Sequence, residues 1–152
     1  MYHISTYDKA GIREKNQISQ TDLQNEYKIW IDLEQPTSTE LSQIQKIFLI
    51  DTNILNQYVT GVKPQIRVLQ NYIFTLIISI KFKTLQTLET EAIYMFIGKN
   101  WLITIHSSNI NLKQITRQIF KNDNKEVIDS SINILYYNIV TKFVDEYEQV
   151  LQ

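Results

Sequence analysis

One strand with apolar side chains on both faces constrains the fold of this chain more than any other feature. Residues 92–106 read AIYMFIGKNWLITIH, two strand-like segments joined by a turn at residues 98–100. Successive side chains of a strand point to opposite faces of its sheet, and in the first segment all of them are apolar. Both faces of the sheet must therefore be covered, which indicates helices on each side of a central hairpin.

The period of two continues before this hairpin. In residues 72–82, Tyr72 and Phe74 point to one face and Thr75 points to the other. Strands are expected in five segments. They are residues 1–7, 27–33, 72–82, 86–97 and 101–106. The polar stretch 8–26 is expected to be loop with some helix.

Helical periodicity marks the remaining segments. A capping box formed by Thr37 and Glu40 predicts the start of a helix, because each side chain can bond the free backbone amide of the other. In the last segment, apolar residues recur at steps of three and four, which predicts a long amphipathic helix. No stop signal follows that helix, so we expect either that the natural protein continues or that the helix frays. The predicted helices cover residues 37–48, 51–59, 111–120 and 126–152.

The composition is typical of one soluble globular domain. The chain has 152 residues, 43% of them hydrophobic, and a net charge of -1, which does not favour nucleic acid as a partner. Cysteine is absent, which excludes disulfides and thiolate chemistry from this chain. The N-terminus lacks the apolar core of a signal peptide. The most apolar run, 72–82, is far too short to span a bilayer.

Few side chains could perform chemistry. The sequence has no nucleophile elbow, and its three glycines are too few for a phosphate-binding loop. His106 beside Ser107 leaves a small hydrolase open as an alternative, whereas His106 and His3 lack the further ligands that zinc requires. Thr104 shares a strand face with His106, so a side-chain hydrogen bond there could tie the strand end to the next loop. A structural histidine is the favoured interpretation, and the carboxylates leave a weak Mg²⁺ site open.

The order of the segments resembles the N-terminal cytoplasmic domain of the CorA-type magnesium transporters. The similar motifs are IWIDL before a capped helix, KPQIRVLQNYIF, GKNWLITIH and ILYYNIVTKFVDEY. They follow one another in the family's order over roughly residues 27–152. The positions that match the family's motifs are Trp30, Pro64, Tyr72, Phe74, Thr104, His106, Tyr136, Asp145 and Tyr147.

The resemblance implies an α/β/α sandwich: a mixed, largely antiparallel sheet covered by helices, with a long C-terminal helix leading to a stalk. It implies that residues 1–152 are a single soluble cytoplasmic domain at the inner membrane, and that the transmembrane pore with its Gly-Met-Asn motif lies outside this chain. The implied function is regulation of a magnesium or other divalent-cation transporter, without enzymatic activity or an organic substrate. The implied partners are the protein's own membrane region and identical subunits, which form a pentamer in full-length family members.

The family's regulatory metal site departs from its usual sequence here. Where the family often has Leu-Glu-Asp, this chain has Ile54-Leu55-Asn56. Asn56 is uncharged and binds a cation more weakly than a carboxylate does, so Asp51 is the candidate to assist it. The resemblance thus assigns Asp51 and Asn56 to a site between subunits for Mg²⁺ or another divalent cation that is not held tightly. A zinc-transporting branch of the superfamily and a free-standing interaction module without a pore are the alternatives.

Overall fold

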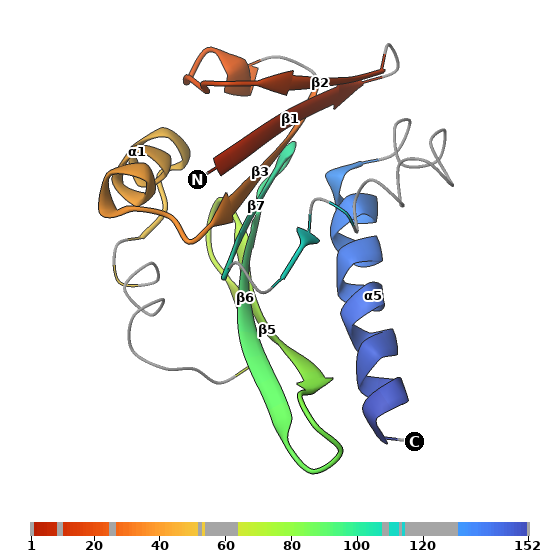
Figure 1. The fold of residues 1–152 in the computed structure, drawn as a ribbon. Coiled ribbons are helices and arrows are strands. Elements are labelled where there is room, and N and C mark those ends of the chain that lie inside the picture. The colour runs from red at the N-terminus through yellow and green to blue at the C-terminus, as the bar shows by residue number, and fades with distance from the viewer. Residues whose placement is uncertain are drawn as a thin grey trace.

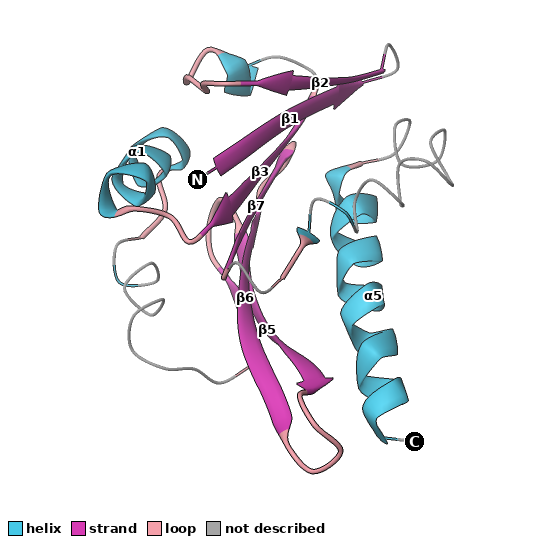
Figure 2. Cartoon of the chain, in the orientation of Figure 1, coloured by secondary structure: helices cyan, strands magenta, loops and turns pink. Residues whose placement is uncertain are grey.

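The protein is a mixed β-sheet with helices on both faces. The computed structural model describes residues 2–8, 11–24, 27–51, 53, 64–107, 110–112, 114 and 131–151. Helix α1 lies on one face of the sheet and helix α5 on the other (Figures 1 and 2). This arrangement confirms the predicted α/β/α sandwich.

The seven strands of the described residues form one sheet in the order β2-β1-β3-β7-β6-β5-β4. Neighbouring strands are antiparallel except for β3 and β7, which run parallel. The sheet is therefore mixed and largely antiparallel, as expected. Its strands are β1 (Tyr2–Asp8), β2 (Gly11–Lys15), β3 (Lys28–Glu34), β4 (Gln65–Val68), β5 (Ile73–Phe82), β6 (Leu88–Ile97) and β7 (Trp101–His106).

The first helix, α1 (Ser38–Phe48), begins as the capping box predicts. The Glu40 amide donates to the Thr37 hydroxyl at 3.1 Å, and the Thr37 amide donates to the Glu40 carboxylate at 2.9 Å. Ile44 and Phe48 are buried against the sheet. The helix ends at Leu49, which adopts the left-handed conformation with φ of 56°.

Strand β6 contributes to both cores, as its sequence predicts. Tyr94 and Phe96 lie in the core on the α1 side. Ile93 and Met95 lie in the core on the α5 side. The prediction that both faces of this strand are covered is confirmed.

Helix α5 (Ile132–Leu151) covers the second face with the predicted apolar stripe. A hydrogen bond from this helix to the sheet joins the hydroxyls of Tyr136 and Thr75 at 2.8 Å. The residues of the stripe that are fully buried are Ile132, Leu135, Ile139 and Phe143. The predicted start of this helix, residues 126–130, lies outside the described residues.

Both edge strands, β2 and β4, are absent from the sequence prediction. The stretch 8–26 was expected to be loop with some helix, but residues 11–15 form β2 and a 3-10 turn, η1, occupies Asp22–Gln24. Both edge strands are largely exposed, so neither carries a buried apolar alternation. The predicted helices at 51–59 and 111–120 lie mostly outside the described residues.

The turn between β6 and β7 is fixed by a side chain packed against a glycine. The Gly98 amide donates to the carbonyl of Trp101 at 2.9 Å. A Cβ atom at Gly98 would lie 2.1 Å from the Trp101 indole. That indole is held by Phe48, whose ring centroid is 4.8 Å away, and by Tyr72 at 6.3 Å. The indole therefore has little room to yield.

Replacement of Gly98 by alanine should destabilise the protein by about 1–3 kcal/mol, because the added methyl group overpacks the turn. Urea denaturation measures this loss. In a Trp101→Ala background, the same Gly98→Ala change should cost much less, since the clashing indole is gone. Equal costs in the two backgrounds would show that the indole contact does not determine residue 98.

Candidate functional site

A chain of buried polar side chains joins the two parallel strands at the centre of the sheet. The register of β3 and β7 places Asp32 opposite Thr104. The Trp30 indole N–H donates to the Thr104 hydroxyl at 3.1 Å, and that hydroxyl donates to Asp32 Oδ1 at 2.7 Å. His106 Nε2 lies 2.7 Å from the same oxygen. Asp32, Thr104 and His106 are each at most 2% exposed, so these contacts are shielded from water.

The hydrogen bonds of His106 indicate that its ring is charged. Nδ1 lies 2.7 Å from the Ser107 carbonyl, which can only accept, and Nε2 faces the Asp32 carboxylate. Burial lowers the pKa of His106. The hydrogen bond and charge of Asp32, the Ser107 carbonyl and the charge of Glu34 outweigh burial and raise that pKa above its ordinary value. The geometry is that of a buried ion pair that ties the end of β7 to β3 and to its own following loop.

The same geometry does not assemble a hydrolytic triad. The Ser107 hydroxyl donates to Glu91 Oε2 at 3.0 Å and makes no hydrogen bond to His106 in the described structure. Both nitrogens of His106 are occupied and the ring is 2% exposed, so it cannot accept a proton from a serine nucleophile. The hydrolase alternative therefore has no support in this site.

Asp51 lies at the exposed end of α1, beside an open pocket. Its amide donates to the Tyr72 hydroxyl at 3.0 Å, and its Oδ1 accepts from the Asn53 amide at 2.8 Å. The pocket has a volume of about 610 Å³ and lies between the end of α1 and the segment that joins β4 to β5. Asn56 lies outside the described residues, so its distance from Asp51 is not defined. Among the described residues, no group of three or more carboxylates and histidines is arranged to hold a metal ion.

The other motif residues divide between core and surface. Phe74 is fully buried and its ring centroid is 5.0 Å from that of Phe96. Burial raises the pKa of Tyr147, whose hydroxyl is hydrogen-bonded to the backbone of Ile78 in β5. Pro64 and Asp145 are exposed, the first before β4 and the second on α5.

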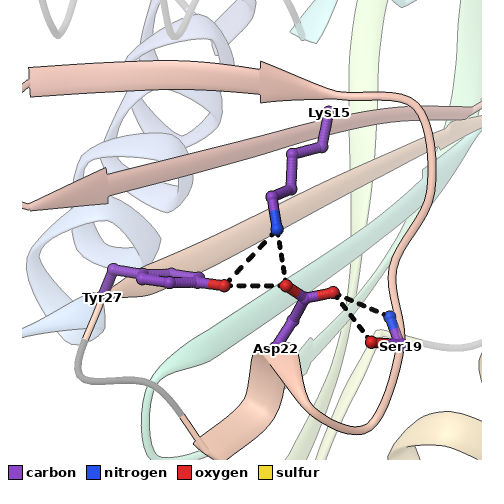
Figure 3. A network of polar contacts seen from close by, with 4 residues as sticks. All are labelled: Lys15, Ser19, Asp22 and Tyr27. Carbon is purple, nitrogen blue, oxygen red and sulfur yellow. Dashed lines mark hydrogen bonds and ion pairs between the residues drawn. The ribbon is translucent and has the colours of Figure 1, made fainter.

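A second polar cluster, which the sequence analysis missed, fastens the start of the chain (Figure 3). Asp22 Oδ1 accepts from Lys15 Nζ at 2.5 Å and from the Tyr27 hydroxyl at 2.8 Å, while Oδ2 accepts from the Ser19 amide at 2.9 Å. These bonds, the one from Lys15 foremost, lower the pKa of Asp22. The sequence pattern that could have indicated this cluster is Ser19-x-x-Asp22, a spacing typical of a capped turn. The cluster links β2, η1 and the approach to β3.

No helix within the described ranges is both long enough and apolar enough to cross a membrane. The arrangement defines an α/β/α domain with a structural ion pair at its centre and a lone exposed carboxylate at the end of α1. Residues 25–152 match the family model described as CorA-like Mg²⁺ transporter protein, and the chain belongs to that family. The family resemblance seen in the sequence is confirmed.

Several solved structures share the fold. The complete CorA magnesium transporter of Methanocaldococcus jannaschii matches 99% of this chain with a TM-score of 0.76 at 21% identity. The soluble domain of CorA from the same organism matches 97% with a TM-score of 0.74 at 22% identity. The cytoplasmic domain of ZntB from Vibrio parahaemolyticus matches 99% with a TM-score of 0.68 at 10% identity.

This chain spans about half the length of those relatives: 46% of the complete transporter and 58% of the soluble domain. No curated protein sequence matches it significantly. At these identities the structures establish the fold.

The charged state of His106 predicts how stability depends on pH. Because the folded pKa is raised, the contribution of the ion pair is complete below the unfolded pKa of about 6.5 and is lost as pH rises through the folded value. In the wild type, the urea concentration at the midpoint of unfolding should therefore decrease as the pH rises above about 6.5. His106→Ala should remove this decline and cost about 3 kcal/mol at pH 6, because Asp32 stays buried without its partner.

His3→Ala is the comparison variant, since it removes the other histidine, which lies opposite Asp32 on β1, and leaves both members of the pair in place. Its pH profile should follow that of the wild type. A decline that persists in His106→Ala would assign the pH dependence to another group.

Proposed function

We propose that this chain is the cytoplasmic regulatory domain of a divalent-cation transporter, with residues 1–152 folded as a single domain. The observation that supports this best is the family match over residues 25–152, together with the overlay of nearly the whole chain on both a complete magnesium transporter and its soluble domain. The membrane region of the same transporter and identical subunits are then its partners. The domain itself performs no reaction and lies at the cytoplasmic face of the membrane.

Mg²⁺ is the proposed regulatory ion, and Asp51 with Asn56 the proposed binding position. Mg²⁺ binds oxygen ligands, often one or two carboxylates plus waters, and the Asp51 carboxylate is exposed beside the pocket at the end of α1. Regulation requires that the cation bind one conformation of the assembly more tightly than another. Further oxygen ligands would come from a neighbouring subunit or from the membrane-linked part of the transporter.

A zinc transporter is the second candidate, because the ZntB cytoplasmic domain has the same fold. The side chains of this chain favour magnesium over zinc. Zinc prefers thiolate and imidazole ligands, whereas the sequence has no cysteine and two histidines. One of the two, His106, uses both ring nitrogens in buried hydrogen bonds.

The transporter proposal predicts what the natural reading frame encodes after codon 152. Two hydrophobic helices joined by a Gly-Met-Asn turn should follow, because the pore motif is not within this chain. Sequencing of the full transcript provides the measurement. A stop codon directly after residue 152 would instead favour the free-standing interaction module.

Magnesium should raise the melting temperature of the domain, because a ligand that binds the native state stabilises it. At a concentration of 100 times Kd the gain is about 2.7 kcal/mol. Differential scanning calorimetry across millimolar MgCl₂ measures the shift, with ZnCl₂ as the parallel titration. Asp51→Asn should abolish the magnesium shift.

Asp145→Asn is the control for charge alone, since Asp145 is also an exposed carboxylate but lies on α5. It should keep the full magnesium shift. An identical shift in the Asp51→Asn variant, or none in the wild type, would refute the Asp51 site. A larger response to zinc than to magnesium would favour the second candidate.

A further inference from the structure

The two hydrogen bonds of the His106 ring cannot both be kept when the ring loses a proton. Nε2 lies 2.7 Å from Asp32 Oδ1, and Nδ1 lies 2.7 Å from the Ser107 carbonyl oxygen. An ionised carboxylate and a carbonyl only accept, so each of these oxygens requires an N–H group of the ring. The charged ring has two N–H groups and the neutral ring has one. Deprotonation therefore leaves either Asp32 or Ser107 without its donor.

The contact with Asp32 is the one that a neutral ring keeps. A hydrogen bond to a carboxylate is roughly twice as strong as one to a neutral carbonyl. The other tautomer would place the lone pair of Nε2 against Asp32 Oδ1, and both residues are only 2% exposed, so water would screen this repulsion little. The neutral ring therefore carries its proton on Nε2, and the lone pair of Nδ1 faces the Ser107 carbonyl.

The Ser107 carbonyl has a second donor nearby. The Ile110 amide donates to it at 3.4 Å, which is longer than the distance of about 2.7–3.2 Å in an ordinary N–H···O bond. The hydroxyl of Ser107 is held separately, because it donates to Glu91 Oε2 at 3.0 Å. The side chain of Ser107 is thus fixed to β6, whereas its carbonyl lies between two donors and can exchange the His106 ring for the Ile110 amide.

A movement of this carbonyl reaches the core beneath α5. Ile110 and Leu112 are buried, and they belong to the same core cluster as Ile132 and Leu135 of α5. Because protein interiors are close-packed, a displacement of Ile110 is passed to its neighbours. The Ser107 carbonyl therefore connects the end of β7 with the contacts that hold α5 on the sheet.

We propose that His106 is a proton-controlled switch at the end of β7. In the charged state the ring binds Asp32 and the Ser107 carbonyl together, and the bond from the Ile110 amide stays long. In the neutral state the ring stays on Asp32, the Ser107 carbonyl turns to the Ile110 amide, and the packing of Ile110 beneath α5 changes. The step moves one proton from Nδ1 to solvent and changes no other covalent bond. This switch goes beyond the proposed transporter function and does not depend on it.

The ionisable groups around the ring are mostly carboxylates, which favour its charged state. The strands and the helix on this face of the sheet contribute Asp32 and Glu34 of β3, Glu91 of β6 and Glu146 of α5, whose Oε2 is buried. His3 of β1 lies opposite Asp32. The cation of β3, Lys28, lies at the other end of that strand, 4.9 Å from the centroid of the Tyr7 ring.

The switch operates at a higher pH than the titration of an ordinary histidine. Burial lowers the pKa of His106, but the hydrogen bond and charge of Asp32, the Ser107 carbonyl and the charge of Glu34 raise that pKa on balance. The charged state therefore persists above about pH 6.5 and gives way to the neutral state as the pH rises through the folded pKa.

An NMR titration of the folded chain from about pH 5 to about pH 9 tests the switch. The ¹⁵N resonances of the ring report which nitrogen carries a proton, and His3→Ala identifies the signals of His106 by removing the other histidine. We expect both ring nitrogens to be protonated at low pH and Nε2 alone at high pH. The amide proton of Ile110 should move downfield with the same midpoint, because its hydrogen bond shortens.

The variant that imitates the neutral ring is His106→Gln. Its amide nitrogen takes the place of Nε2 toward Asp32, but the side chain does not titrate and supplies no donor to the Ser107 carbonyl. The Ile110 amide proton of this variant should keep the downfield position at every pH. Ser107→Ala is the matched control, since it removes the hydroxyl bond to Glu91 and keeps the carbonyl, so both transitions should persist.

Three results of the wild-type titration would overturn the proposal. The first is a neutral ring protonated on Nδ1, because the bond to Ser107 would then survive. The second is an Ile110 resonance that does not follow the titration of His106. The third is a His106 ring that keeps one charge state over the whole range. The titration uses the wild-type chain, so it decides the question whether or not His106→Gln folds.

Discussion

The parallel pairing of β3 with β7 is the contact on which the rest of the sheet depends. On one side of it, β2, β1 and β3 form an antiparallel unit from the first 34 residues, and on the other, β7 to β4 form a second one. No other strand pairing joins the two units within the described structure. The chain of hydrogen bonds from Trp30 through Thr104 and Asp32 to His106 connects β3 with β7. The two strands are therefore held together by side chains as well as by backbone hydrogen bonds.

A buried ion pair between two strands contributes more to the specificity of the fold than to its net stability. Removing two charges from water costs several kcal/mol, and an apolar pair of similar size is often equally stable. Here the pair specifies the register between β3 and β7. Asp32 Oδ1 accepts from both Thr104 and His106, which are two residues apart on β7, and a slip of β7 by one residue would turn both of them to the opposite face. We infer that the pair fixes how the two units of the sheet meet.

The sequence predicted the elements that are buried and missed those that are exposed. Residues 101–106 were expected as a strand and form β7, and the capping box at Thr37 was correct, because burial and capping leave local patterns. The edge strands β2 and β4 are largely exposed and leave no such local pattern in the sequence. The sequence singled out Trp30, Thr104 and His106 but not Asp32, because the pairing of Asp32 with His106 joins residues 74 positions apart. The proposed Asp51–Asn56 position remains a prediction, since it derives from family resemblance and one of its members lies outside the described residues.

The end of the sheet near Asp51 is connected to its centre by direct contacts. The Asp51 amide bonds the Tyr72 hydroxyl, and the Tyr72 ring packs near Phe96 and Trp101, with centroids 5.9 Å and 6.3 Å away. Trp101 is the first residue of β7, the strand whose last residue is His106. Because interiors are close-packed, a displacement at Asp51 would be felt first at Tyr72, which is 7% exposed and belongs to the same core cluster as Phe96. The tightly packed Gly98–Trp101 contact leaves the turn before β7 little freedom, so Asp51, Tyr72 and that turn form one closely packed connection.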